Sequence, residues 1–418
     1  MNSTSKMKVE KIVYVTDIDA SKDNGAGINE RGFLNAVSDF EEVICILPFP
    51  HFSEIYFNPK HTYVYGHYGK LWRYPLYALH LCYCLFKLSI RFKIKACALR
   101  IGLSPFIPLL YSYLLKIPLL LKTYPGIDPH ENIPWKKLIF RWKPLRIRLQ
   151  HYLLKFMYQA IVSRSVIIDC PSDTCRASVL NDKDIASEKV ITIPNGVNTD
   201  FFKPLNTNFR KELGFSEQDK IIGYIGALNG EIRFTDHLID GFEQLIKKRS
   251  DTYLLLVGDG QNRKALEQKC AKKQILKNVF FTGFIKNDTI PHYMSVLDAA
   301  VDLTAVPVRV NCNIQYASYS QKIAQYLSCG VPVVCWDIED TKFIEKNNLG
   351  ALSQIFNIID LAEKLNQIVS LDPKSWNSLS KRARVYSLDN LSYAIIAQQR
   401  LQIWKRTVDP NNKLWQNS

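Results

Sequence analysis

The sequence predicts an α/β protein made of two doubly wound, Rossmann-like domains that face a cleft. Short apolar runs of strand length alternate with helical patterns over most of the 418 residues, which is typical of parallel sheets covered on both faces. The length allows two or three domains with cores of their own. The alternation occurs on both sides of a turn-forming segment at 194–198, where we place the domain boundary.

The first 194 residues carry the weaker pattern. A buried strand is predicted at 12–16, followed by a loop to residue 27 and a helical pattern over 29–37. Further apolar runs of strand length lie at 43–47, 119–122, 166–168 and 190–193. We predict that residues 1–194 form the N-terminal domain.

The second half alternates more regularly. Strands are predicted at 221–225, 253–257, 279–282, 300–303 and 331–335. Helices are predicted between them at 236–247, 262–273, 291–297 and 321–327. We predict a second domain over 195–388, with the ligand at the carboxyl ends of the strands in the cleft between the domains.

The last segment, 389–418, predicts a single amphipathic helix. Asn390 is a good N-cap, and apolar residues then recur at spacings of three and four: Ala394, Ala397, Leu401, Trp404 and Val408. One arrangement that we predict for this helix is packing back against the N-terminal domain.

The cysteine pattern and the N-terminus favour a cytoplasmic protein. The ten cysteines include no CxxC pair, and Cys82 and Cys84 have no neighbouring residue that would complete a metal site. The N-terminus has no long apolar core, so we expect no signal peptide. We expect reduced thiols and no metal.

Positive charge is concentrated in one segment. The net charge is +15, and residues 60–165 hold eighteen Lys/Arg against two acidic residues, Asp128 and Glu131. The apolar stretches at 75–90 and 107–121 contain Lys87 and Lys116 and are too short to span a membrane.

Basic and apolar residues alternate closely within that segment. Aromatic and basic residues mix at 135–143, and Leu145, Leu149 and Phe156 share a helical face with basic residues beside it. This mixture favours an interfacial helix on an anionic membrane surface. A core helix with a solvated basic face is the alternative. No nucleic-acid-binding motif is present, so we expect no nucleic acid partner.

Two glycines and three polar residues are candidates for binding phosphate or a nucleotide. Gly25 and Gly27 precede a helix and allow backbone N–H groups to approach a phosphate, although a plain loop explains them as well. Arg233 lies just before a helix, where a guanidinium would complement a diphosphate. Lys322 and Gln325 share one helix face. The alternatives are a solvated loop arginine for Arg233, a surface lysine for Lys322 and a helix-filling glutamine for Gln325.

Four motifs in order resemble a known enzyme family. They are IPNGVNTDFFKP at 193–204, LLLVGDG at 254–260, VFFTGF at 279–284 and the segment from Lys322 to Val334. Over about residues 190–370 the chain resembles the GT-B glycosyltransferases, in particular the retaining family 4 group that uses nucleotide-sugar donors. The resemblance implies an acceptor-side domain over 1–194 and a donor-binding domain over 195–388.

The resemblance also implies roles for single residues. Arg233 falls where the family has a diphosphate-binding lysine, and Lys322 matches a lysine of the family's Lys-x-x-Glu-Tyr variant. Gly283 and Phe284 fall where backbone groups meet the nucleobase. Gln325 replaces a ribose-binding glutamate, and its amide can still form a hydrogen bond.

Two further positions depart from the family pattern. Ala317 replaces the first glutamate of the family's pair, and Ala227 replaces an arginine. The family's histidine near the reacting sugar is missing, and Asp128 and His130 are the polar residues nearby that we name as catalytic candidates. A turn before Pro129 is the alternative role of Asp128.

The resulting expectation is a retaining, metal-independent glycosyltransferase without a cofactor, peripheral on the inner face of the cell membrane. It would move a sugar from a nucleoside-diphosphate sugar to a lipid-linked or polysaccharide acceptor. A catalytically degenerate partner subunit of a polysaccharide-synthesis system is the alternative. A GT-B epimerase or phosphorylase is a third hypothesis, which no residue pattern favours.

Overall fold

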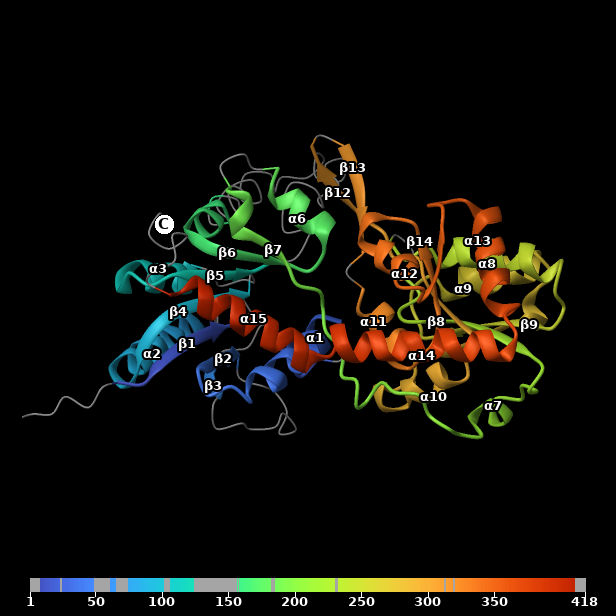
Figure 1. Ribbon diagram of the computed structural model, residues 1–418, viewed down its shortest axis with the longest axis horizontal. Helices are drawn as coiled ribbons and strands as arrows, with labels where there is room; N and C mark the ends of the chain where they lie inside the picture. The colour runs from blue at the N-terminus through green and yellow to red at the C-terminus, as the bar shows by residue number, and fades with distance from the viewer. Residues whose placement is uncertain are drawn as a thin grey trace, which may run out of the picture. The chain divides into compact units, whose positions relative to one another are not determined.

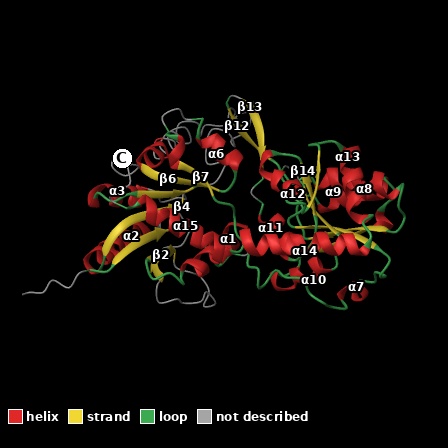
Figure 2. Ribbon diagram, viewed as in Figure 1, coloured by secondary structure: helices red, strands yellow, loops and turns green. Residues whose placement is uncertain are grey.

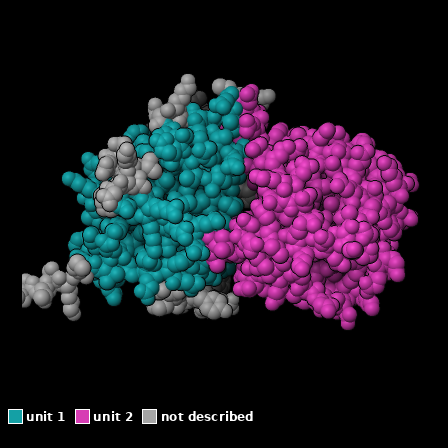
Figure 3. All heavy atoms as spheres, in the orientation of Figure 1, with its two compact units in different colours: residues 1–194, 310–312, 396–418 teal, residues 195–309, 313–395 magenta. Residues whose placement is uncertain are grey.

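The structure is a computed structural model with two compact units (Figures 1 and 3). The first unit consists of residues 1–194, 310–312 and 396–418, and the second of residues 195–309 and 313–395. The structure describes residues 8–22, 25–48, 61–64, 74–100, 106–123, 156, 158–181, 185–229, 232–311, 313–318 and 320–409.

The first unit is built on a sheet of seven strands in the order β3-β2-β1-β4-β5-β6-β7, each paired in parallel with its neighbours. The strands are β1 (Glu10–Val15), β2 (Val43–Pro48), β3 (His61–Val64), β4 (Lys93–Arg100), β5 (Leu119–Lys122), β6 (Ser165–Cys170) and β7 (Val190–Thr192). Every residue of β2, β5 and β6 is buried, as expected for strands covered on both faces.

Helices cover both faces of this sheet (Figure 2). They are α1 (Gly25–Val37), α2 (Tyr74–Arg91), α3 (Phe106–Leu115), α6 (Asp173–Val179) and α15 (Tyr393–Thr407). One core joins α1 and α15 to the sheet face that carries Ile12 and Tyr14. The opposite face, which carries Val13 and Val15, packs against α2 and α3. Alternate residues of β1 therefore serve two cores.

The second unit repeats this architecture with a parallel sheet of six strands in the order β10-β9-β8-β11-β14-β15. The strands are β8 (Lys220–Ile225), β9 (Thr252–Val257), β10 (Val279–Gly283), β11 (Ala299–Asp302), β14 (Val333–Trp336) and β15 (Gly350–Ser353). Two further strands, β12 (Val306–Val310) and β13 (Asn313–Ala317), pair with each other.

The helices of the second unit are α7 (Phe209–Glu212), α8 (Thr235–Ile246), α9 (Arg263–Lys272), α10 (Ile290–Ser295), α11 (Gln321–Ser328), α12 (Lys342–Lys346), α13 (Ile358–Val369) and α14 (Pro373–Asn390). One core packs α8, α9 and α13 against the sheet, and the other packs α10, α11 and α12 against it. Of the described helices, none combines the length and apolar character needed to cross a bilayer.

The C-terminal helix α15 belongs to both units. Tyr393, its first residue, donates its backbone N–H to the Val197 carbonyl in the second unit (3.0 Å). From Ile396 onward the helix belongs to the first unit, where Trp404 stacks on Tyr14 with ring centroids 6.0 Å apart. The spacing that predicts this helix places Ala397, Leu401 and Trp404 in the core.

Candidate functional site

The candidate site of the second unit lies at the carboxyl ends of β8, β9 and β10, where three glycines meet. Gly226, Gly258 and Gly283 all have positive φ. The Gly258 N–H donates to the Gly283 carbonyl (3.1 Å), and a Cβ added to Gly258 would lie 2.1 Å from the Gly226 oxygen. The three strand ends therefore pack backbone against backbone, and a side chain at Gly258 has no room.

The Gly258→Ala variant should lose about 3 kcal/mol or more of unfolding free energy, because the new methyl group adds a backbone clash to an unfavourable φ of 134°. Gly214→Ala is the matched control, since Gly214 also has a positive φ but faces open space, and should cost about 1 kcal/mol. Urea denaturation of both variants measures the difference. Equal losses would show that the close approach to Gly226 is unimportant.

Lys322, in the first turn of α11, extends its side chain to the same edge of the sheet. Ser320 caps this helix and accepts a hydrogen bond from the Lys322 backbone N–H. The Lys322 ammonium donates to Asp302 Oδ1 (2.9 Å) and Thr304 Oγ1 (3.1 Å) and lies 4.9 Å from the centre of the Tyr224 ring. The predicted donor-binding lysine thus has a counter-charge within the protein.

Asp302 is a member of this site that the sequence reading missed. Its side chain is fully buried at the end of β11. Burial alone would raise its pKa, but the Lys322 charge and the hydrogen bonds to the carboxylate outweigh burial and lower the pKa of Asp302. A carboxylate within the apolar run 299–303 was the available signal, because a buried charge needs a partner.

Arg233 lies beside this edge, two residues before α8. Its neighbour Ile232 accepts a hydrogen bond from the Ala305 N–H (3.0 Å), which ties the Arg233 loop to the segment following β11. Arg233 is partly exposed and makes no ion pair with any residue that the structure describes. The N-cap residue of α8 is Phe234, which adopts a left-handed conformation and makes no side-chain capping hydrogen bond. Arg233 and this helix end together suit an anionic ligand.

The remaining predicted donor residues occupy different environments. Gly283 is buried at the end of β10, with Arg263 Nη1 2.8 Å from the position of an added Cβ, whereas the adjacent Phe284 is 78% exposed. Gln325 lies one turn after Lys322 on α11 and is partly exposed. Ala317 is fully buried at the end of β13.

In the first unit, Gly25 and Gly27 lie in the first turn of α1, whereas the sequence suggested a loop up to Gly27 and a helix from residue 29. The first turn of α1 packs closely on the preceding loop at Gly27, which requires a glycine there. An added Cβ at Gly27 would lie 2.3 Å from the Lys22 oxygen and 2.9 Å from the Asp19 oxygen. Gly25 faces open space.

The first unit also contains a buried ion cluster, which we define as Glu30, Arg100, Lys122, Asp169 and Arg400. Glu30 accepts hydrogen bonds from Arg100 and from the Tyr14 hydroxyl (2.6 Å), and its Oε2 lies 3.7 Å from the Lys122 ammonium. Arg400, on α15, donates to Asp169. The cluster collects charges from the ends of β4, β5 and β6.

Burial and pairing change the pKa values of this cluster in different directions. Burial alone would raise the pKa of Glu30, but Arg100, Lys122 and the Tyr14 hydrogen bond lower it to about 2. Burial lowers the pKa of Lys122 to about 7, because attraction to Glu30 offsets only part of the desolvation and of the repulsion from both arginines. Burial raises the pKa of Asp169 despite Arg400.

Several predicted residues lie outside the described part of the chain. They include the catalytic candidates Asp128 and His130, the basic segment 135–143 and most of the helical pattern that ends at Phe156. Their predicted roles stay predictions. Among the described cysteines, all are free thiols, and Cys82 is exposed while the others are buried.

Comparison with known proteins finds a matching family model within the second unit. Residues 206–386 match the family model "Glycosyl transferases group 1". The chain is 26% identical to a putative teichuronic acid biosynthesis glycosyltransferase, TuaH, of Bacillus subtilis, over 44% of each protein. It is 20% identical to the alpha-D-kanosaminyltransferase of Streptomyces kanamyceticus, over 73% of this chain and 74% of that protein.

A solved structure shares the whole architecture. Anabaena Alr3699/HepE, crystallised in complex with UDP, superposes with a TM-score of 0.70 over 94% of this chain and 99% of that chain, at 16% identity. The fold is therefore that of the GT-B glycosyltransferases, which confirms the predicted fold class. The residues that match the group 1 glycosyl transferase model lie in its second unit.

Proposed function

We propose that the protein transfers a sugar from a nucleoside-diphosphate sugar to a lipid-linked or polysaccharide acceptor, with retention of anomeric configuration. The observation that carries the proposal is the strand edge of the second unit, where β8, β9 and β10 end in closely packed glycines and Arg233 precedes α8, whose N-cap residue makes no side-chain capping bond. This edge lies within the residues that match the family model. The bound UDP of the Anabaena protein supports a nucleotide donor.

In the proposed reaction, the second unit holds the diphosphate and stabilises it as it leaves. Arg233 is the main cation, because Lys322 already faces the Asp302 carboxylate. Backbone N–H groups at the start of α8 add partial positive charge without reorganising. We propose that these groups replace a metal ion and that no cofactor is needed. Undiminished turnover in EDTA would support the proposal that no metal ion is needed. Loss of turnover in EDTA that Mg²⁺ or Mn²⁺ restores would contradict it.

The first unit would hold the acceptor, with Asp128 and His130 as the proposed catalytic residues near the reacting sugar. Segment 60–165, with eighteen basic and two acidic residues, supports an anionic membrane surface as the place of reaction. We propose a cytoplasmic protein that is peripheral on the inner face of the membrane. Release of the protein from isolated membranes by high salt would support this peripheral location.

The Arg233→Ala variant should weaken nucleoside-diphosphate binding by about 30-fold to 150-fold, because a charged hydrogen bond contributes roughly 2–3 kcal/mol. We would measure thermal stabilisation and slow nucleotide release with UDP-, GDP-, ADP- and dTDP-sugars. Arg382→Ala is the control, because Arg382 is an exposed arginine on α14. Unchanged binding by Arg233→Ala would rule out its proposed role.

A degenerate partner subunit is the second candidate function. The features that favour it are Ala317 and Gln325, in place of two glutamates, and the compensation of Lys322 by Asp302. A folded protein that binds none of the four sugar nucleotides would favour this alternative. One preferred nucleotide with slow hydrolysis would favour the transferase.

A further inference from the structure

The outer surface of the first unit carries an unusual amount of exposed apolar side chain. Ten of the twenty-two exposed large hydrophobic residues of the described chain lie on the two helices α2 and α3. On α2 these are Leu76, Leu79, Tyr83, Phe86 and Ile90. On α3 they are Phe106, Leu110, Tyr113, Leu114 and Leu115. We call these ten residues the apolar face.

The spacing on α2 shows that the apolar face is a continuous stripe. Its five residues are separated by three, four, three and four positions, so they line one side of the helix. The opposite side, with Leu81, Leu85 and Leu88, packs in the core. Helix α2 is therefore apolar on two opposite sides, although a helix at the surface of a globular protein is usually polar on its outer side.

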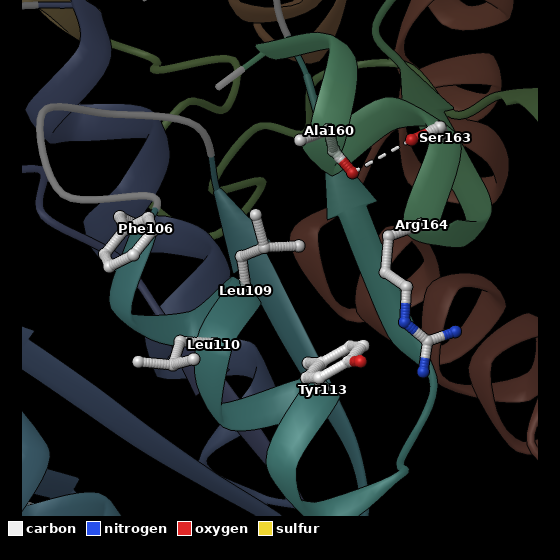
Figure 4. A pocket seen from close by; sticks show the side chains of 7 residues that line it. All are labelled: Phe106, Leu109, Leu110, Tyr113, Ala160, Ser163 and Arg164. Atoms are coloured by element: carbon white, nitrogen blue, oxygen red, sulfur yellow. Dashed lines mark hydrogen bonds between the residues drawn. The ribbon is translucent and has the colours of Figure 1, made fainter. Parts of the chain in front are cut away.

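Helix α3 extends the apolar face. The two helices touch through the Ser89 and Tyr111 hydroxyls, 2.6 Å apart, and both cover the same face of the sheet. Beside α3, a shallow cavity of about 410 Å³ is lined by the α3 residues Phe106, Leu109, Leu110 and Tyr113 and by Ala160, Ser163 and Arg164 (Figure 4). An exposed patch of this extent in a water-facing protein marks an interaction site.

The charges around the apolar face identify the partner. The sequence from Tyr74 to Thr123 contains seven Lys/Arg and no Asp or Glu. Lys87, Arg91 and Lys116 are exposed on or next to the two helices. We propose that the apolar face docks on an anionic lipid bilayer, with its side chains among the acyl chains and the three cations at the head groups.

This inference deepens the proposed function by naming the contact surface, and it rests on that proposal only for the location of the reaction. The sequence expectation placed the membrane contact in the basic segment 60–165 and singled out an interfacial helix at 135–156, whereas the apolar face lies on α2 and α3 of the same segment. Because α2 and α3 lie flat on the sheet, they enter the bilayer along their sides and do not cross it.

The test compares vesicle binding of the full chain and the double variant Leu79→Glu/Phe86→Glu. Vesicles contain equal parts of phosphatidylglycerol and phosphatidylcholine, or phosphatidylcholine alone. We expect binding to the anionic vesicles and at least about tenfold weaker binding by the variant. Val385→Glu/Leu388→Glu on α14 is the control, because it replaces a pair of exposed apolar residues on one helix of the second unit with the same two charges. The control should bind like the wild type.

Three outcomes would overturn the proposal. The first is equal vesicle binding by the wild type and the α2 variant. The second is slow labelling of the Cys82 thiol by monobromobimane, because a covered Cys82 would mean that the chain itself shields α2. The Cys82→Ser variant identifies which part of the labelling belongs to Cys82. The third is a wild-type protein that binds no vesicles and forms a dimer in analytical ultracentrifugation, together with an α2 variant that is monomeric. The apolar face would then join two copies of the chain.

Nucleotide binding separates this proposal from the proposed function. The α2 variant should keep the thermal stabilisation by sugar nucleotide seen for the wild type, because the substituted residues lie in the other unit. Vesicle binding without any nucleotide binding would support the docking face and contradict the transferase. Nucleotide binding without vesicle binding would support the transferase and contradict the docking face.

Discussion

Glu30→Gln should destabilise the first unit by about 3–5 kcal/mol, because Arg100 and Lys122 would lose the carboxylate that compensates them in the buried ion cluster. Urea denaturation, followed by the fluorescence of the buried Trp404, measures the effect. Glu42→Gln is the control, since Glu42 forms an exposed ion pair with Lys405, and it should cost less than about 1 kcal/mol.

The pH dependence of this difference tests its electrostatic origin. The pKa of Glu30 is about 2 in the folded protein, below the ordinary value of 4.5 for a glutamate. A lowered carboxyl pKa stabilises the folded state above the unfolded pKa, and this stabilisation is lost as the pH falls from 4.5 towards 2. The gap between wild type and Glu30→Gln should therefore narrow over that range. A gap that stays constant with pH would mean that packing, not charge, explains the loss.

Lys322→Met should destabilise the second unit by about 3–5 kcal/mol, because it leaves Asp302 buried without its cation. The double variant Lys322→Met/Asp302→Leu should recover most of that loss, since it removes both charges. Thermal unfolding of the single and double variants measures the two effects. A double variant no more stable than Lys322→Met would show that the ion pair is not the source of the loss.

The same pair of variants separates the structural role of Lys322 from its proposed donor role. If Lys322 also contacts the diphosphate, the double variant will be stable but will bind the sugar nucleotide less tightly than the wild type. If Arg233 supplies the positive charge alone, the double variant will bind the nucleotide as the wild type does. Arg233→Ala, by contrast, should leave stability unchanged, since Arg233 has no ion-pair partner in the described chain.

The strands of the second half were predictable because each is a short apolar run between helices with one apolar side. Helix α2 was not predicted, because its two apolar sides remove the helical period from the sequence. Strand β4 was missed because it begins with Lys93 and Lys95 and continues with small residues. Strand β15 has only four residues and begins with a glycine.

For the candidate site, the sequence identified residues that belong to local motifs and missed those that depend on distant partners. Arg233 and Lys322 stand beside recognisable strand and helix ends. The pairing of Glu30 with Arg100 joins positions 70 residues apart, and that of Arg400 with Asp169 joins positions 231 apart. No local pattern encodes such pairs, because only the order of the strands brings them together.

The division of the first unit between two distant stretches of chain determines how the protein can be dissected. Trp404 and Arg400 reach this unit from the far end of the sequence and complete its core and its buried ion cluster. A fragment that ends at Pro194 would expose the faces of Tyr14 and Phe33 that Trp404 covers and would leave Asp169 without its arginine. During synthesis, the unit that is made first therefore has to wait for the last helix before its structure is complete.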